Sequence, residues 1–544
     1  MITTVNHIAA PGGQSTAAVS PVAVQATTES SQKALVWEED PYAVEPEVVL
    51  HLIDLYFAHV NNATHCLFPR NAFMHWLRTC HDKCQAERMV LYAMLALGSV
   101  FADDHLSGFG KHCARIATNA VSGQIGNHVL CSVQARLLIA LYHFAKGSYG
   151  AAWDWSGCAI RASTSAALRL NTEEGCKDDS DSRSHHRYEF FLSPEQMAEC
   201  KRRTFWACFL MDLYDKGTTC AIALQDIFLR LPCTDEAYER GLLSDAPYYN
   251  NGIIDPVSTI ITPSSPVCPM ARLALIAAIW SDVLNFTNRA VHRPDSTYRQ
   301  AYEAQYAETH NQLQGWSSRL PDYLRYSEAN LDRSIQSGYV GAFIAMHVLY
   351  NLILIRMNRY VRHAQMPGLT SRNIRAAHYH AHALLTVMGA VRNARREVVD
   401  PGNGRRSEFV LAIPSAGYAI MSAIDVVGAG DLDSNIGTAL EVMNGGLDCL
   451  RELAKFWTSA RDQLRDCERR YYQIHNIISR PFKAKNGAWL GREWGTKDPL
   501  EREFGLEHDV IYASDGDGYS PHYFDALREK VHDGRSPAGG LRIA

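Results

Sequence analysis

Residues 195–216 read EQMAECKRRTFWACFLMDLYDK, and this stretch decides how the sequence around it is interpreted. Its large apolar side chains, among them Trp206 and Phe209, recur at three- and four-residue spacing, which predicts one buried stripe of an α-helix. Arg202 and Arg203 lie one turn before the tryptophan, where a guanidinium can stack on a ring or pair with a carboxylate. The stretch therefore predicts a helix with a packed aromatic face and a charged start.

Helical periodicity of the same kind extends over most of the chain, while alternating strand patterns bounded by hairpin turns are nearly absent. The sequence therefore predicts an all-α fold, a large multi-helix body of irregular superhelical or bundle-like form. A disordered N-terminal leader and a poorly structured C-terminal tail are expected at its ends. The predicted helices span residues 70–80, 86–102, 109–124, 131–146, 150–170, 195–216, 269–292, 298–319, 335–362, 371–398, 407–427 and 434–478.

Composition predicts three segments along the chain. Residues 1–45 are expected to form a disordered leader, because they are rich in small and polar residues without an amphipathic period. The ordered body is predicted to span 46–478, with halves of about 46–232 and 269–478 on either side of a proline-rich loop. Residues 479–544 are polar and glycine-rich, and an irregular tail is expected there.

The charge balance bears on nucleic-acid binding. The chain has 544 residues, with 53 Lys and Arg against 58 Asp and Glu. The acidic excess lies in the first 50 residues, and the other 494 hold 52 side chains of each sign. Because affinity for DNA scales with the number of phosphates neutralised, the composition argues against strong nucleic-acid binding by this chain alone.

Cysteine use and hydropathy indicate the cellular compartment. Fourteen cysteines are scattered through apolar helical patterns, which is typical of buried thiols in a reducing compartment. The start of the chain has neither a basic n-region nor an apolar h-region, so secretion is not expected. The apolar run 339–355 contains His347 and Asn351, and polar groups inside a membrane are expensive. We therefore expect a soluble, intracellular protein with a buried core helix at this run and no membrane segment.

The sequence contains only partial matches to known catalytic motifs. Asp103 and Asp104 lack the third carboxylate of a D-D-x-x-D magnesium site, and Phe190 stands where a motif built on His186 would need an aspartate. No nucleophile elbow, phosphate-binding loop or dinucleotide fingerprint occurs. The sequence therefore predicts no enzyme, although an all-α enzyme of unrecognised type remains an alternative.

Metal ligands have one candidate group, around residues 75–84. Structural zinc sites favour paired C-x-x-C knuckles, which the chain lacks. We therefore interpret the cysteines of this group as buried thiols on one helix face, and no cofactor is predicted for this chain. The group consists of His75, Cys80, His81 and Cys84.

A second distinctive segment, 134–170, precedes the opening stretch. Glycines and alanines there have the spacing that lets two helices approach closely, with Trp153 expected as the large filler between them. After the opening stretch the sequence continues through further characteristic positions. These are Ile222, Asp226, Leu231 and Pro232, which continue from Asp212 within the opening stretch.

In combination these segments closely resemble the fungal-specific transcription factor domain, also called the middle homology region of zinc-cluster regulators. The entry around Tyr56 to Pro69 is similar to the start of that family, and the stretches 313–321 and 347–356 are similar to its second half. The resemblance covers roughly residues 47–460. It implies fold or regulatory roles, not catalytic ones, for Trp153, Arg161, Arg202, Arg203, Trp206, Asp212, Asp226 and Pro232.

The sequence departs from the family pattern in two places. Residues 216–220 replace a Gly-Arg-Pro that the family often carries after the aspartate helix. Regulators of this type also carry six cysteines that bind two zinc ions and place a short helix in the major groove, whereas residues 1–65 contain no cysteine. Zinc and direct contact with promoter DNA are therefore expected only if a cysteine cluster exists upstream, which the true 5′ end of the transcript would decide.

The resemblance implies a nuclear location, and two basic stretches are candidates for import. Lys201 to Arg203 opens a helix whose next turn is aromatic, so we interpret this stretch as structural ion pairs. The other stretch crosses a Pro-Gly loop and is better placed for recognition. It consists of Arg392, Arg395, Arg396, Arg405 and Arg406.

Two further features allow a functional and a structural interpretation. An apolar seam with 3-4 spacing from Trp457 to Ile478 could pair two protomers, but packing on its own body explains it as well. The acidic and apolar residues 36–40 could recruit transcriptional machinery, and a plain linker is the simpler interpretation.

The leading hypothesis is the regulatory body of a zinc-cluster-type regulator that controls RNA polymerase II transcription of a pathway or gene cluster. The family resemblance also implies a small-molecule effector bound between helices and a homo- or heterodimer. The alternative is a co-regulator that does not bind DNA and heterodimerises with a full-length zinc-cluster factor. Under that alternative, promoter DNA is reached through the partner.

Overall fold

The computed structural model describes residues 39–177, 188–212, 220–250, 259–290, 293–361, 366–397, 410–428 and 436–479. Within these residues the regular structure is helical, and extended segments pair only through isolated β-bridges. The all-α prediction is confirmed. The N-terminal helices are α2 (Pro41–Val44), α3 (Pro46–Tyr56), α4 (Arg70–Thr79), α5 (Gln85–Gly98), α6 (Ser107–Ser122), α7 (Leu130–Ala145), α8 (Tyr149–Ser163), α9 (Glu173–Cys176), α10 (Pro194–Asp212) and α11 (Asp235–Arg240). The C-terminal helices are α12 (Pro269–Ala290), α13 (Asp295–Ser318), α14 (Glu328–Gln336), α15 (Val340–Arg359), α16 (Thr370–Glu397), α17 (Ala416–Gly428), α18 (Ile436–Leu453) and α19 (Thr458–Ser479).

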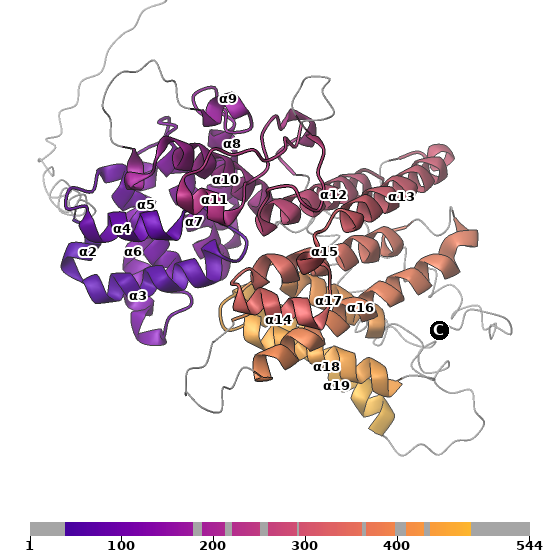
Figure 1. Ribbon diagram of the computed structural model, residues 1–544. Helices are drawn as coiled ribbons and strands as arrows, with labels where there is room; N and C mark the ends of the chain where they lie inside the picture. Colours follow the sequence, from indigo (N-terminus) through magenta and orange to yellow (C-terminus); the bar gives the residue numbers. More distant parts are fainter. Residues whose placement is uncertain are drawn as a thin grey trace, which may run out of the picture.

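The N-terminal helices pack around α5 and α7, which are buried along nearly their whole length (Figure 1). Helices α3, α6 and α8 pack against this pair, and α10 packs against α7 and α8. Close approach of α3 and α5 depends on Gly98, since a Cβ there would lie 2.3 Å from the carbonyl oxygen of Leu52. The apolar periodicity of these segments thus produces one common core.

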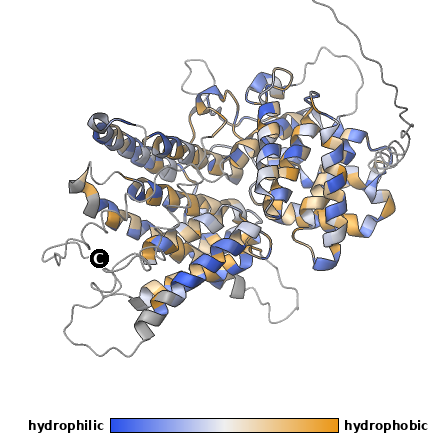
Figure 2. Cartoon of the chain, turned by 180° about the vertical axis from the view of Figure 1, so that it is seen from behind, coloured by the Kyte–Doolittle hydropathy of each residue, from blue (hydrophilic) through white to orange (hydrophobic). Residues whose placement is uncertain are grey.

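The C-terminal helices are organised by α12, α15 and α16. Helix α15 packs between α12 and α16, and α17 and α18 connect α16 to α19. Helices α12 and α15 are long and apolar enough to span a membrane, but 78% of the apolar window of each is buried inside the body. The prediction of a buried core helix at 339–355 is confirmed. Figure 2 shows hydrophobic residues gathered where helices face one another and hydrophilic ones along outer faces such as that of α19.

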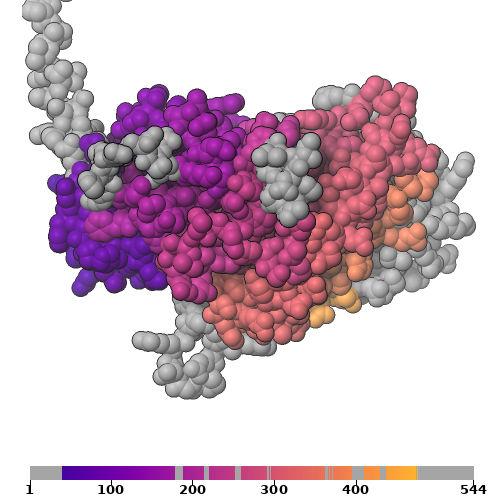
Figure 3. All heavy atoms as spheres, turned by 45° about the horizontal axis from the view of Figure 1, so that its top comes forward, coloured from indigo at the N-terminus to yellow at the C-terminus, as the bar shows by residue number. Residues whose placement is uncertain are grey.

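The two groups of helices are in direct contact (Figure 3). Helix α10 contacts α12, and α19 contacts α7. At the second contact the hydroxyl of Thr458 donates to the carbonyl of Ala145 at 2.9 Å, and the ring of Trp457 lies against Phe101 and Phe144. Trp457, Ala460, Cys467 and Ile474 of the predicted apolar seam are buried, so this part of the seam packs on the chain's own body, as the simpler interpretation predicted.

Most helix boundaries differ from the predicted ones by a few residues, and the four largest differences each have a local reason. The predicted helix 335–362 is divided into α14 and α15 at Gly338, whose φ of 77° is left-handed. The predicted helix 407–427 begins only at Ala416, after Pro414, whose ring is tolerated only in a first turn. The predicted helix 150–170 ends at Ser163, before Arg169 adopts a φ of 43°.

The fourth difference is the predicted helix 434–478, which is two helices. Helix α18 ends at Leu453 and α19 begins at Thr458, with the chain turning so that Trp457 enters the core. Because apolar residues keep their spacing through the turn, periodicity could not locate the break.

The ordered body also begins earlier than predicted. Asp40 caps the short helix α2 by accepting the N–H of Tyr42 at 3.1 Å, and its carboxylate pairs with the buried ammonium of Lys83 at 2.8 Å. The hydroxyl of Tyr92 donates to the carbonyl of Glu39. These contacts fix the end of the acidic segment 36–40 to the body, which a plain linker would not require. The rest of the predicted leader and the tail beyond Ser479 lie outside the described residues.

Candidate functional site

Helix α10 of the N-terminal half carries a buried ion-pair cluster. Arg202 donates from Nε to Glu173 at 3.1 Å and from Nη1 to Glu199 at 3.1 Å. Arg203 donates from Nε to the other oxygen of Glu199 at 2.9 Å and from Nη1 to Asp235 at 2.8 Å. Two guanidinium groups therefore meet three carboxylates from α9, α10 and α11, as the ion-pair interpretation predicts for Arg202 and Arg203.

Electrostatics hold both arginines in the charged state. Burial opposes the charge of Arg202, but the hydrogen bonds of Glu173 and the charge of Glu199 together raise its pKa above the usual value. For Arg203, burial also opposes the charge, while Cys268 and the carboxylates of Asp235 and Glu199 raise its pKa. Its guanidinium also lies 4.4 Å from the ring centroid of Tyr238. Arg230 adds a third cation, with its Nε 3.8 Å from Glu173, so three basic side chains face three carboxylates. This balance of charge is what permits such polar groups in a core.

The other family-motif residues of α10 fasten the segment that follows it. Trp206 is fully buried, and its indole N–H donates to the carbonyl of Arg230 at 3.0 Å. The carboxylate of Asp212 accepts the backbone N–H groups of Ala221 and Ile222 at 2.7 and 3.0 Å. Both side chains thus attach residues 220–230 to the end of α10. Neither contact creates a reactive centre.

Asp226 and Pro232 lie in the same segment but differ in environment. The side chain of Asp226 is exposed, while its backbone carbonyl accepts the side-chain amide of Asn171 at 2.8 Å. Pro232 is buried, and its carbonyl accepts the N–H of Cys268 at the start of the C-terminal half. The structure therefore brings six family-motif residues together around α10: Arg202, Arg203, Trp206, Asp212, Asp226 and Pro232.

The remaining two family-motif residues, Trp153 and Arg161, lie on α8 and away from this cluster. The expectation that Trp153 fills the space between two helices is wrong, because its side chain is 49% exposed. The face of α8 that packs on α7 is made of small residues such as Ala152 and Ala159. Trp153, Gly157 and Arg161 follow one another at four-residue spacing on the outer face. Close helix packing thus left no room for a large side chain.

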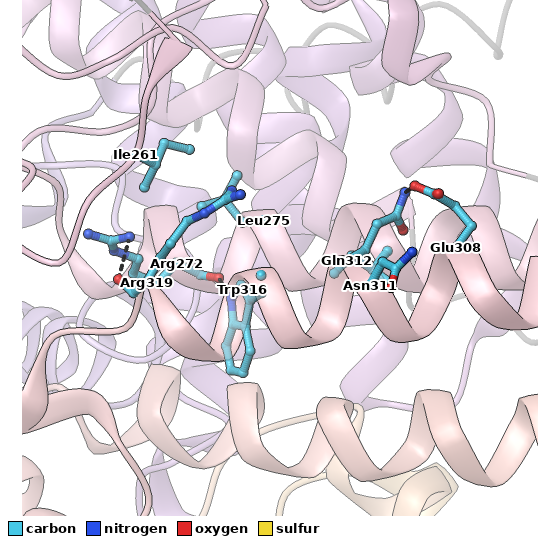
Figure 4. Close-up of a pocket in the computed structure, with 10 residues that line it drawn as sticks. Ile261, Arg272, Leu275, Glu308, Asn311, Gln312, Trp316 and Arg319 are labelled. Atoms are coloured by element: carbon cyan, nitrogen blue, oxygen red, sulfur yellow. Dashed lines mark hydrogen bonds between the residues drawn. The ribbon is translucent and has the colours of Figure 1, made fainter.

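A groove of about 340 Å³ lies along α12 and α13 and is a candidate ligand site (Figure 4). Arg272 and Arg319 lie toward one end of it, and Glu308, Asn311 and Gln312 lie further along α13 (Figure 4). Sequence analysis did not single out any of these residues. One signal could have found Arg272: it is a lone cation within the otherwise apolar stretch 270–280.

A second cavity, of about 360 Å³, lies where the two halves meet. Its walls come from the segment before α4, from α11 and from the segment before α15, and include Arg203, Asp235 and Tyr339. Since the charge of Arg203 is already balanced by carboxylates, this cavity offers no uncompensated charge to a ligand from that side. It adjoins the cluster on α10.

The candidate metal ligands do not share one helix face. Helix α4 ends at Thr79 and α5 begins at Gln85, so the break between the helices separates Cys80 from Cys84. Cys80 is buried, whereas Cys84 is exposed and its backbone N–H donates to Glu87. Among the residues that the structure describes, no three His, Cys, Asp or Glu side chains converge on a point that could hold a metal ion.

The candidates for nuclear import are only partly described. Arg392 lies on α16, with Nη1 3.5 Å from the carboxylate of Asp448 on α18. Arg395 and Arg396 lie in the last turn of α16, and their side chains are outside the description. Arg405 and Arg406 lie in the segment 398–409, also outside the described residues.

Comparison with known proteins matches the part of the chain that contains α10. The family model of the fungal specific transcription factor domain matches residues 53–317, from α3 to α13. An uncharacterized transcriptional regulatory protein of Schizosaccharomyces pombe is 26% identical over 344 residues, which cover 60% of this chain and 34% of that protein. The nitrogen assimilation transcription factor nirA of Emericella nidulans is 25% identical over 287 residues, which cover 50% of this chain and 29% of that protein.

A longer match is to a Zn(2)-C6 fungal-type transcription factor of Fusarium oxysporum f. sp. lycopersici, 21% identical over 473 residues that cover 82% of this chain and 49% of that protein. The chain therefore spans about a third to a half of the length of these relatives.

Proposed function

We propose, because this chain belongs over residues 53–317 to the fungal specific transcription factor domain family, that it is the regulatory body of a fungal transcription regulator. The observation that carries the proposal is the family match, which includes the whole α10 cluster. The relatives are also named as transcriptional regulators. The proposed role is control of RNA polymerase II transcription of a pathway or gene cluster, without catalysis.

Two routes to promoter DNA are open to such a body. One is direct contact through a zinc cluster of the kind named for the Fusarium oxysporum relative. The other is recruitment by a partner factor with which this chain forms a heterodimer. The equal numbers of basic and acidic side chains outside the first 50 residues favour recruitment, since this part of the chain has no surplus charge for phosphates.

We propose a nuclear location, with import through the basic stretch at the end of α16. Arg405 and Arg406 are its test positions, because Arg392 is already engaged with Asp448. Replacing both with Gln should lower the nuclear fraction of a fluorescent fusion. The matched control is Arg240→Gln, an exposed arginine paired within its own helix. Equal nuclear fractions in both variants would remove the stretch from the proposal.

The transcriptional role is tested by deleting the gene in its native host and sequencing the RNA. We expect a coherent set of genes to change and to be restored by the full chain. A Glu199→Ala version should restore little, because it breaks the α10 cluster, while Glu236→Ala should restore fully, because Glu236 is exposed. An unchanged transcriptome after deletion would overturn the proposal.

A further inference from the structure

The α12–α13 groove contains an arginine whose charge is not balanced by a carboxylate. Arg272 is buried, with only 2% of the residue's surface exposed. Its Nη1 donates to the carbonyl of Arg319 at 3.2 Å and its Nη2 to the carbonyl of Thr262 at 2.6 Å, while its Nε has no hydrogen-bond partner. Within the described parts of the chain, no Asp or Glu lies within ion-pair distance of it.

This environment is the reverse of that of the α10 cluster. There, carboxylates raise the pKa values of Arg202 and Arg203 despite their burial. At Arg272, burial is the largest effect and lowers the pKa. The nearby groups of Tyr323 and Cys268 raise it, the charge of Arg319 lowers it, and the net shift is downward. A buried cation is usually paired, because removing it from water is expensive unless an anion replaces the water. The neighbourhood of Arg272 therefore has the electrostatics of a site prepared for an anion.

The other residues that line the groove indicate what the rest of such a ligand would be like. Leu275, Ile279 and the ring of Trp316 form apolar surface beside the two arginines. The Trp316 indole is held in place, since its N–H donates to the carbonyl of Arg272 at 3.0 Å. Further along α13, the amide of Gln312 donates to Glu308 at 2.9 Å and presents polar groups toward the far end (Figure 4). A volume of about 340 Å³ suits a metabolite rather than a macromolecule.

We propose that this groove binds a small organic acid, with a carboxylate of the ligand seated against Arg272 and Arg319 and its carbon chain along Leu275 and Trp316. That this acid acts as the effector of a transcription regulator rests on the proposed function. The binding itself does not. A bidentate arginine–carboxylate pair gives both strength and orientation, which is why an acid fits this end better than a neutral compound.

The test measures the melting temperature of the full chain in the presence of simple dicarboxylic acids and of matched uncharged compounds. Glutarate and adipate are compared with glutaramide and adipamide, which have the same chain lengths without the charge, and with inorganic phosphate at equal ionic strength. We expect the acids to raise the melting temperature by about 2 °C or more at saturating concentration, and the amides and phosphate to raise it less.

Two glycine variants separate binding from folding. Gly315 lines the groove, and a Cβ there would meet only the flexible end of Arg319, at 3.5 Å, so Gly315→Leu should fill the groove without disturbing α13. Gly157→Leu is the matched control, since Gly157 lies inside helix α8 with nothing within 4 Å of an added Cβ. The acid-dependent shift should disappear in the first variant and persist in the second. The exposed Arg319→Gln variant should weaken the shift.

Three outcomes would overturn the proposal: no shift with either acid, an equal shift with the diamides or phosphate, or a full shift in Gly315→Leu. Failure of the proposed function is a separate result, because it would appear as an unchanged transcriptome after gene deletion while acid binding by the purified chain remained.

Discussion

Glu199 and Arg203 lie one turn apart on α10 and form an ion pair of 2.9 Å in which both side chains are buried. The same carboxylate oxygen accepts the backbone N–H of Cys233 at 2.9 Å, and the other oxygen pairs with Arg202. Glu199 therefore joins two arginines of α10 to the segment that leads into the C-terminal half. One carboxylate thus ties α10 to the segment that follows it within the family-matched part of the chain.

The first prediction concerns that carboxylate. Glu199→Ala should lower the free energy of unfolding by about 3–5 kcal/mol, because it leaves two buried guanidinium groups without their shared partner. Urea denaturation measures this change. Glu236→Ala is the control: its pair with Arg240 is exposed, so about 0–1 kcal/mol is expected. Similar losses in both variants would contradict the role given to Glu199.

The second prediction concerns the two tryptophans of the family motif. Trp206→Ala should cost about 3–5 kcal/mol, since it empties a fully buried site and leaves the carbonyl of Arg230 without its donor. Trp153→Ala should cost about 0.5 kcal/mol or less, since its side chain is half exposed. Thermal unfolding compares the two variants, and a large loss at Trp153 would mean that it packs as a filler after all.

The third prediction concerns the attachment of residues 220–222 to α10. Asp212→Ala removes the acceptor of two backbone N–H groups and should cost about 1–3 kcal/mol. Hydrogen exchange gives the more specific readout. The amides of Ala221 and Ile222 should lose protection, while those of the α5 core should exchange as before. Unchanged protection at both amides would show that Asp212 does not hold this segment.

The fourth prediction concerns pH. Burial lowers the pKa of His347 to about 4, and its Nε2 donates to the carbonyl of Leu324 at 2.9 Å. The unfolded chain takes up this proton near pH 6.5, so the stability that the neutral ring contributes is complete above that pH. It is lost as the pH falls from about 6.5 to about 4, by about 3 kcal/mol at the lower end.

His347→Gln keeps a donor for Leu324 but cannot titrate. Denaturation at several pH values should therefore show a shallower fall in stability between pH 6.5 and 4 for this variant than for the parent chain. Parallel curves would rule out His347 as a source of the pH dependence.

How much of this could be predicted from sequence depends on the range of the interaction. Apolar periodicity located most helices, including α10 and α15, because it records which face of a helix is buried. It could not locate the turn before Thr458, where the apolar spacing continues, nor place Trp153, whose exposure depends on how closely α7 and α8 pack. The pairing of Arg202 with a carboxylate was predictable in kind. Its partner Glu173, 29 residues earlier, was not.

The groove on α12 and α13 lay beyond sequence analysis for the same reason. A lone Arg272 in an apolar stretch signals a buried cation, but not whether a carboxylate reaches it from elsewhere in the chain. Only the fold shows that Thr262 and Arg319 supply carbonyl oxygens there instead.

The most direct test of the central claim is chromatin immunoprecipitation of the full chain, tagged at its native locus, followed by sequencing. The account predicts enrichment at a discrete set of promoters whose genes change on deletion, whether the chain reaches them directly or through a partner. Enrichment no greater than in an untagged strain, under conditions in which the protein is present, would contradict it.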